Sequence, residues 1–166
     1  MRTRERKAYY GKYLGVVTDN RDPQMKGRLK ARVPDVKGDN ESSWALPSVP
    51  YAGDGVGFFM IPPVDALVWI EFENGHWDHP IWSGSFWDDG QAPASPAVAE
   101  MKVLKTDNCT LTLDDTPGTG GITIETSSGQ KIVLNSQGIE ITNGQGASIK
   151  LSGPTVKING EALEVT

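Results

Sequence analysis

The C-terminal part of the chain, residues 103–166, consists of short runs in which apolar and polar residues alternate, with Gly or Asn between the runs. Alternation with a period of two indicates β-strands that carry one apolar face. Aromatic residues are missing from this part, although all thirteen Trp, Tyr and Phe residues of the chain precede it. The apolar positions of the clearest runs are Ile122, Ile124, Ile132, Leu134, Ile139, Ile141, Ile149, Leu151, Val156 and Ile158.

These one-faced strands need a cover for their apolar side chains. No helical pattern is available to supply it, and some 65 residues of narrow strands make little core by themselves. Two solutions remain: a monomeric solenoid, or three identical chains that wrap around a shared axis. A solenoid with such short rungs needs very tight corners and capped ends, whereas intertwined chains have no free edges along the shaft. We therefore predict a homotrimeric β-helix with dense interchain hydrogen bonding and with the ten residues above in its core.

The N-terminal part has a different pattern, with β-like runs at residues 9–18, 27–34, 56–61, 66–73 and 80–87. The second run places Leu29, Ala31 and Val33 on one face and three cations on the other. Turn residues separate these runs, and no helical period occurs among them apart from a turn around residue 44. Five strands at this spacing predict a small closed barrel, most simply an OB-fold. Four tryptophans are candidates for its buried area: Trp44, Trp69, Trp82 and Trp87. Gly84, within the last run, indicates a β-bulge or a close approach of the backbone.

Between the two parts, residues 88–102 are rich in Pro and small residues, as linkers are. The sequence thus predicts an all-β protein with an OB-fold domain at residues 1–87, a linker at 88–102 and a trimeric β-helix at 103–166.

The net charge of −5 conceals an asymmetry. Residues 1–37 hold 11 of the 16 Lys and Arg residues with only four acids, a balance of +7 that leaves −12 for the rest. A basic segment is compatible with nucleic-acid binding. We favour instead a solvated strand face or a docking surface for an acidic partner, and predict no specific nucleic-acid partner.

The start of the chain and its single cysteine bear on where the protein is made. No apolar stretch or cleavage site follows the basic start, so we expect no signal peptide. Cys109 is the single cysteine, which precludes an internal disulfide and favours synthesis in a reducing cytoplasm. Its place in an alternating run predicts a buried strand residue and not a nucleophile.

Candidate catalytic and metal-binding groups are few. His76, Asp78 and His79 are the only cluster of metal-capable side chains, and they follow a turn signal at Asn74 and Gly75. The acidic pairs at residues 88–89 and 114–115 lie beside Gly or Pro, where Asp stabilises turns. No nucleophile elbow, phosphate loop or Cys-x-x-Cys motif occurs. We therefore predict no catalytic residues, no metal site and no cofactor.

The N-terminal part carries a series of short motifs in a specific order and spacing. They are the segments at residues 15–23, 27–34, 43–45, 50–53, 57–62, 66–75 and 79–87, including the stretches Gly-Arg-Leu-Lys-Ala-Arg-Val-Pro and His-Pro-Ile-Trp-Ser-Gly-Ser-Phe-Trp. In these segments the chain resembles the baseplate-assembly and central-spike family of contractile phage tails, which includes type VI secretion spikes. The C-terminal part resembles that family by pattern more than by motif.

This resemblance implies an OB-fold followed by a triple-stranded β-helix, located in the baseplate of a virion tail or injection particle. It implies docking of the OB-fold to a tail hub protein and transient piercing of a target membrane by the β-helix. Some relatives insert a lysozyme domain, for which residues 88–102 are too short, and others bind iron through His-x-His tips, whereas no histidine follows His79. The apolar strand that runs to residue 166 predicts a blunt end, which in this family is often capped by a separate tip protein.

Two other functions are compatible with parts of the sequence. An OB barrel could bind single-stranded nucleic acid or an oligosaccharide through Tyr, Trp and Lys or Arg side chains. That function does not account for the repetitive acidic C-terminal part. A cell-wall hydrolase lacks a plausible acid/base pair and a domain to carry it.

Overall fold

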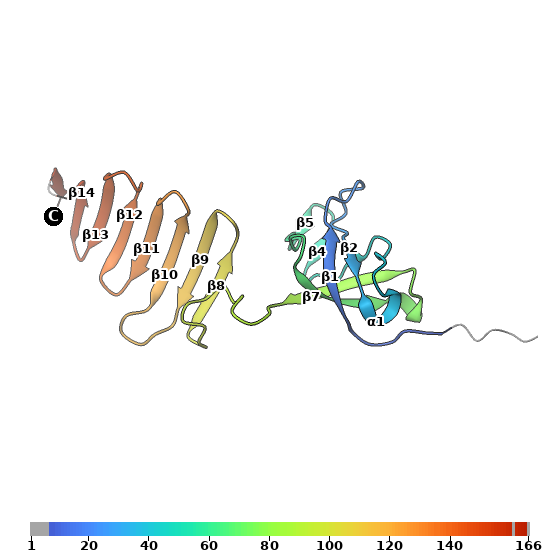
Figure 1. The fold of residues 1–166 in the computed structure, drawn as a ribbon. Helices are drawn as coiled ribbons and strands as arrows, with labels where there is room; N and C mark the ends of the chain where they lie inside the picture. Colours follow the sequence, from blue (N-terminus) through green and yellow to red (C-terminus); the bar gives the residue numbers. More distant parts are fainter. Residues whose placement is uncertain (1–6, 161, 166) are drawn as a thin grey trace, which may run out of the picture. The chain divides into compact units, whose positions relative to one another are not determined.

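The computed structural model describes residues 7–160 and 162–165, and the chain divides into two compact units, Met1–Gly90 and Gln91–Thr166. In both units the regular secondary structure is almost entirely β-strand (Figure 1). Within the described residues, neither helical segment is long and apolar enough to cross a membrane.

The N-terminal unit is a five-stranded sheet with the order β2-β1-β6-β7-β3. The strands are β1 (Tyr13–Asp19), β2 (Lys30–Arg32), β3 (Leu46–Pro47), β6 (Leu67–Phe72) and β7 (Pro80–Phe86). All neighbours are antiparallel except β3, which runs parallel to β7. An antiparallel bridge between Leu29 and Ala45 joins the two edges, so that the sheet closes into a barrel.

The barrel interior follows from the alternation in its strands. Leu29, Ala31 and Val33 are fully buried, as the pattern of residues 27–34 predicts. They pack with Val17, Ala45, Val68, Ile70, Phe72 and Trp82 in one core. The indole N–H of Trp82 is also buried and donates a hydrogen bond to the carbonyl of Gly27 at 3.1 Å. One well-formed core therefore holds this unit together.

Two predicted strand features differ in the structure. Residues 56–61 do not join the barrel; instead β5 (Val56–Gly57) pairs with β4 (Ala52–Gly53) in a separate hairpin, and β3 is the fifth barrel strand. The run at 27–34 ends in a short helix, α1 (Pro34–Lys37), which the sequence analysis missed. Proline at the first helical position fixes a helical φ and lacks only an N–H that would have no partner there.

The predicted bulge at Gly84 is confirmed, because two residues of β7, Ser83 and Gly84, lie opposite one residue of β6, Trp69, and Gly84 has φ +113°. Of the four tryptophans expected in the barrel, only Trp82 is fully buried. Trp44 and Trp69 are half-buried, and the prediction for Trp87 is wrong, since this side chain is 66% exposed. Trp87 follows the end of β7, where no barrel strand remains to cover it.

The loop between β1 and β2 is fixed by one carboxylate. Asp22 accepts hydrogen bonds from the backbone N–H groups of Gln24, Lys26 and Arg28, and the Arg28 guanidinium lies 2.6 Å from its Oδ1 atom. The Arg28 side chain and these N–H donors hold the pKa of Asp22 well below its usual range. This arrangement presents Met25, with φ +54°, at the surface of a rigid loop.

The C-terminal unit is a single eight-stranded sheet whose strands follow one another in chain order (Figure 1). The strands are β8 (Met101–Lys105), β9 (Cys109–Asp114), β10 (Gly121–Thr126), β11 (Lys131–Asn135), β12 (Gly138–Thr142), β13 (Ser148–Ser152), β14 (Thr155–Ile158) and β15 (Leu163–Val165). Every neighbouring pair is antiparallel. β8 begins at Met101, two residues inside the predicted linker.

The backbone pairing of this sheet corrects one expectation. The ladder hydrogen bonds join consecutive strands of the same chain, whereas dense interchain hydrogen bonding was predicted. Short turns bring consecutive strands together, so local pairing costs little loop entropy. Each strand from β9 to β14 thus has both of its ladder partners within the chain.

Candidate trimer interface

The register of the C-terminal sheet places the ten predicted core residues on one face. Directly opposed residues of antiparallel strands point to the same face. One column runs through Ile122, Leu134, Ile139, Leu151 and Val156. A second column runs through Ile124, Ile132, Ile141, Ile149 and Ile158, and Leu104, Leu111 and Leu163 continue it at its ends.

Nothing among the described residues covers this apolar face. Every fully buried hydrophobic side chain of the described chain belongs to the N-terminal unit, and none lies in β8–β15. Ile124 is 46% exposed and Ile141 41%, although both lie in the middle of the sheet. A shallow groove of about 600 Å³ runs over the face, between Ile124, Ile132, Ile141, Ile149 and Ile158. Such an exposed apolar surface marks an interaction site.

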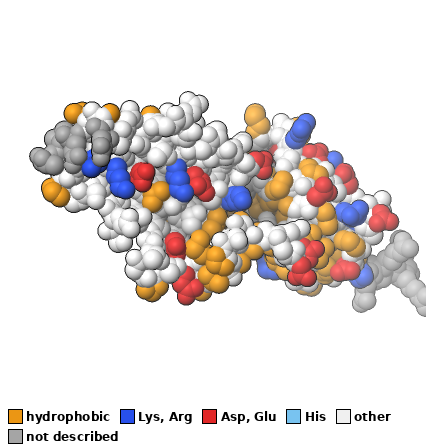
Figure 2. Space-filling view, turned by 60° about the vertical axis from the view of Figure 1, so that its left-hand side comes forward, with side chains coloured by type: hydrophobic (Ala, Val, Ile, Leu, Met, Phe, Trp, Pro, Cys, Tyr) orange, Lys and Arg blue, Asp and Glu red, His pale blue; other side chains and the backbone are white. Residues whose placement is uncertain are grey.

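The opposite face of the sheet is polar. Its central column contains Thr123, Val133, Glu140, Lys150 and Lys157, in that order. At the flank, Glu125 forms an ion pair with Lys131 across β10 and β11 at 3.4 Å. Figure 2 shows Lys or Arg and Asp or Glu side chains following one another in a row along the C-terminal unit. The unit thus has one face suited to water and one suited to burial.

Side chains in the turns fix the register that separates the two faces. The Asn135 side-chain oxygen accepts a hydrogen bond from the Gln137 N–H, and Asn143 accepts two, from Gln145 and Ala147. Asn159 accepts from the Ser148 N–H at 2.9 Å. A shift by one residue would move every isoleucine to the polar face. The asparagines therefore protect the apolar face against slippage.

Glycine contributes to this geometry at one position in particular. Gly138 opens β12 with φ +136°, and a Cβ atom there would lie 1.9 Å from the carbonyl oxygen of Leu151. No side chain fits between these two backbones. The close approach of β12 and β13 therefore requires glycine at this position.

The acidic pair at residues 114–115 serves the β9–β10 turn. The Thr116 side chain and backbone N–H lower the pKa of Asp114, whose carboxylate accepts that N–H at 2.9 Å. Asp115 forms an ion pair with Lys102 on β8. Both carboxylates have local structural partners, in agreement with the turn interpretation.

The histidine cluster lies in the loop between β6 and β7, which includes the short 3-10 helix η1 (Glu73–Gly75). The rings of His76 and His79 are 5.9 Å apart, and His79 Nδ1 lies 3.7 Å from Glu73 Oε2. In the part of the chain that the structure describes, no group of three or more His, Cys, Asp or Glu side chains is arranged to hold a metal ion.

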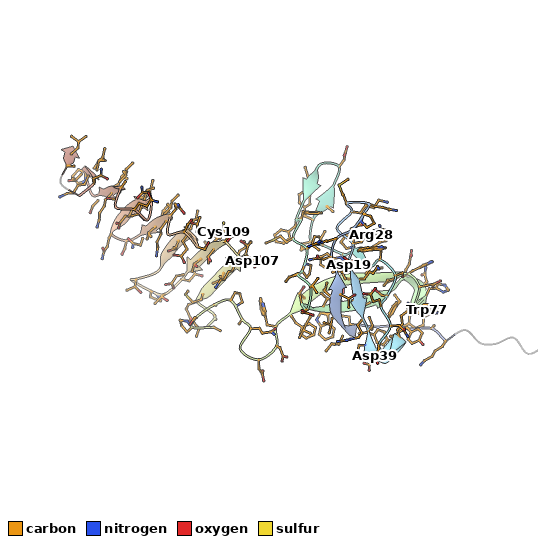
Figure 3. All side chains as sticks on the ribbon, turned by 45° about the horizontal axis from the view of Figure 1, so that its top comes forward. Asp19, Arg28, Asp39, Trp77, Asp107 and Cys109 are labelled. Atoms are coloured by element: carbon orange, nitrogen blue, oxygen red, sulfur yellow. The ribbon has the colours of Figure 1, made fainter. Side chains whose placement is uncertain are left out.

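Cys109 begins β9, next to the turn that contains Asp107 (Figure 3). Cys109 lies in a strand, as predicted. The prediction that its side chain is buried is wrong for the single chain, since Cys109 is exposed. Its cross-strand partner is Thr126, beside the column of Ile124, and so it lies on the uncovered apolar face. The burial was expected from the strand pattern, which does not show whether a second layer covers the strand.

Several basic side chains of the N-terminal unit have partners within that unit. Lys12 lies 3.2 Å from Glu71, and Lys30 lies 3.4 Å from Glu41. Lys30 and Arg28 both lie over the ring of Trp44, at 5.2 and 5.6 Å from its centre. The basic face predicted for residues 27–34 is thus largely engaged in local ion pairs and cation–π contacts.

The chain thus combines a closed barrel with a sheet whose uncovered apolar face marks it as a protein that associates through this face. Residues 13–87 match the type VI secretion system/phage-baseplate injector OB domain. Residues 101–164 match the phage baseplate V C-terminal trimerisation domain. The chain therefore belongs to the baseplate spike family of phage tails and type VI secretion systems, and the resemblance found in the sequence is confirmed. No curated protein matches the chain.

These matches establish the broad role of the chain. It is an OB-fold protein with a C-terminal trimerisation domain, and both matched families are structural components of a baseplate or injector. Its place is accordingly the baseplate of a virion or injection system.

Proposed function

We propose that three copies of this chain form the central spike of a contractile injection machine, with their C-terminal units packed around a threefold axis. The observation that carries this proposal is the uncovered apolar face with its two columns of Ile, Leu and Val. In the trimer the three faces turn inward as the walls of a prism, and the ten predicted residues form its core.

The energetics favour this arrangement. Burial of the remaining exposed area of each predicted core residue (Ile, Leu or Val) contributes roughly 1–2 kcal/mol. Ten such residues per chain outweigh the roughly 4–15 kcal/mol that each association step costs in translational and rotational freedom. The resulting shaft has a dry interior, with ladder hydrogen bonds inside each chain and charged residues outside. Rigidity of this kind suits a part that transmits force along its axis.

The two ends of the spike have different roles in this proposal. The OB unit docks to the tail hub, with the basic N-terminal segment as a docking surface for an acidic partner. The β-helix points outward and passes through the target envelope when the sheath contracts. A separate tip protein covers the last strands, of which β15 has a strand partner on one side only among the described residues.

The solution mass of the purified chain tests the assembly. Light scattering, without and then with detergent, is expected to give a species of about three times the 18.0 kDa chain. A monomer would contradict the shared core and would favour the alternative, an OB module that binds single-stranded nucleic acid or oligosaccharide.

The docking and piercing roles need separate tests. The purified trimer is expected to bind the isolated hub protein of the same particle through the OB unit. Particles that carry a spike with a broken shaft are expected to contract without delivering their contents. Binding of the hub by the C-terminal unit instead would contradict the proposed orientation.

A further inference from the structure

A second apolar surface lies on the OB unit, apart from the barrel core. The side chains of Met25, Tyr51, Val56, Phe58 and Phe59, here called the hairpin patch, are between 48% and 87% exposed. All five line one groove of about 530 Å³ between the β4–β5 hairpin and the loop that precedes β2. An exposed group of large apolar and aromatic side chains marks an interface.

The hairpin patch is preorganised. The loop that carries Met25 is held by the Asp22 carboxylate, which accepts the N–H groups of Gln24 and Lys26 at 2.9 and 2.8 Å. The hairpin is closed by the Phe58 N–H, which donates to the Tyr51 carbonyl at 2.8 Å. A Cβ atom on Gly27 would lie 3.2 Å from the Phe59 ring, so this loop and the hairpin segment pack closely. Little conformational entropy is therefore lost when this surface binds.

The charges around the groove favour a second copy of the same chain as its occupant. Lys26 lines the groove, whereas Asp54 lies in the turn of the hairpin, between β4 and β5. Among the described residues neither has an ion-pair partner. The same unit thus offers a hairpin with a negative tip and an apolar groove with a positive residue. Contacts of this head-to-tail kind close into a ring when the rotation between copies fits.

The trimerisation domain would bring the copies together. Between the end of β7 at Phe86 and the start of β8 at Met101 the chain is fourteen residues long. A flexible linker of that length spans on average about 20 Å. Tethering at this range gives effective concentrations in the millimolar range, so a contact too weak for free OB units is populated within the trimer.

We propose that, in the spike trimer, the β4–β5 hairpin of each OB unit inserts into the hairpin-patch groove of the next copy, with Asp54 against Lys26, so that three OB units form a closed ring. This inference rests on the proposed homotrimer. It adds an interface that the shaft does not require.

Cross-linking in the full-length chain tests this ring. In the test variant, a photoreactive benzoylphenylalanine replaces Phe59, which is 72% exposed. In the control variant it replaces Trp77, which is exposed on the β6–β7 loop. Irradiation of the Phe59 protein is expected to yield covalent dimers and trimers on denaturing gels, with the linked peptides at residues 25–27 or 47–61 of another copy. The Trp77 protein is expected to give none of these products.

Charge exchange sharpens the test. Asp54→Lys is expected to lower the yield of cross-linked product roughly threefold. The substitution removes an exposed ion pair and places two lysines against each other, and an effect of this size is typical of exposed charge pairs. The double variant Asp54→Lys/Lys26→Asp is expected to restore it, because the pair is re-formed with opposite polarity. Failure of the double variant to recover would overturn the proposed pairing.

Other outcomes separate this inference from the proposed function. A trimeric mass with no cross-link between OB units, or with equal yields at both positions, overturns the ring but leaves the spike intact. Cross-links only to the hub protein in assembled particles would assign the hairpin patch to the hub and also overturn the ring. A monomeric mass would overturn both.

Discussion

Ile132 on β11 and Ile141 on β12 lie directly opposite each other on the apolar face of the C-terminal sheet, and Ile149 follows next on β13. This row continues across the sheet, yet no described residue packs over it. A single chain therefore leaves its most regular apolar surface in water, and the proposed trimer would remove that surface from water.

The substitution Ile141→Asp is expected to break the trimer. It would place three carboxylates without partners around the axis, at a cost of several kcal/mol each. Light scattering is expected to show loss of the species at three times 18.0 kDa. Lys150→Asp, on the polar face of the neighbouring strand, is the matched control and is expected to leave the mass unchanged. A trimer of Ile141→Asp with unchanged melting temperature would contradict the proposed core.

Substitution of Gly138 by alanine is expected to destabilise the sheet by more than backbone strain alone, because the new Cβ atom also clashes with a neighbouring strand. Both Gly138 and Gly146 have positive φ, +136° and +101°, so alanine at either costs about 1–3 kcal/mol in strain. Only at Gly138 does the new Cβ meet the Leu151 backbone; at Gly146 nothing lies within 4 Å. Thermal unfolding followed by far-UV circular dichroism is expected to show a clearly larger loss for Gly138→Ala. Equal losses would contradict the close approach of β12 and β13.

The Trp82→Phe substitution is expected to affect the OB unit alone. It removes the buried donor to the Gly27 carbonyl and leaves that oxygen without its partner, which costs about 1–3 kcal/mol. All aromatic residues precede residue 88, so fluorescence of the remaining tryptophans reports only on this unit. A lower fluorescence melting temperature with an unchanged trimer mass is expected. The control Trp77→Phe, at an exposed position, is expected to change neither.

Asp22 is expected to give the OB unit an acid-sensitive component of stability. Its pKa in the folded protein lies well below the ordinary Asp value of about 4, mainly because of Arg28. A depressed folded pKa means that the stabilisation is complete above about pH 4 and is lost as the pH falls toward the folded pKa. Asp22→Asn is therefore expected to lower the fluorescence melting temperature by several degrees at pH 7. The difference in melting temperature between Asp22→Asn and the unsubstituted protein is expected to narrow below about pH 4. A difference that stays constant with pH would contradict a contribution from the Asp22 carboxylate.

The predictions that held depended on local periodicity. Alternation alone places Leu29, Ala31 and Val33 inside the barrel, and it places Ile122 and Ile124 on one face of their strand. Because side chains in a strand alternate between its two faces, the residues that share a face can be identified without knowledge of the partner strand. The bulge at Gly84 was also predictable, since glycine inside a strand marks an irregular backbone.

The features that were missed depend on partners distant in the sequence. The fifth strand of the barrel is β3 and not residues 56–61. The pairing of β3 with β7, some 35 residues further along the chain, decides this. Trp87 is a large apolar residue of the kind that fills cores, but it lies just beyond β7, the last strand of the barrel, and is exposed. Periodicity carries no information on which strands meet, and local turn chemistry and long-range packing compete to decide it.

The sequence by itself determined that the C-terminal strands each have one apolar face, because a period of two is a property of every strand. Only the tertiary structure decided that these strands pair consecutively within the chain, which aligns Ile124, Ile132, Ile141, Ile149 and Ile158 in one unbroken column. The physical reason is that the turns between consecutive strands satisfy the backbone locally. No described residue covers the aligned side chains, and in the proposed trimer the other copies of the chain bury them.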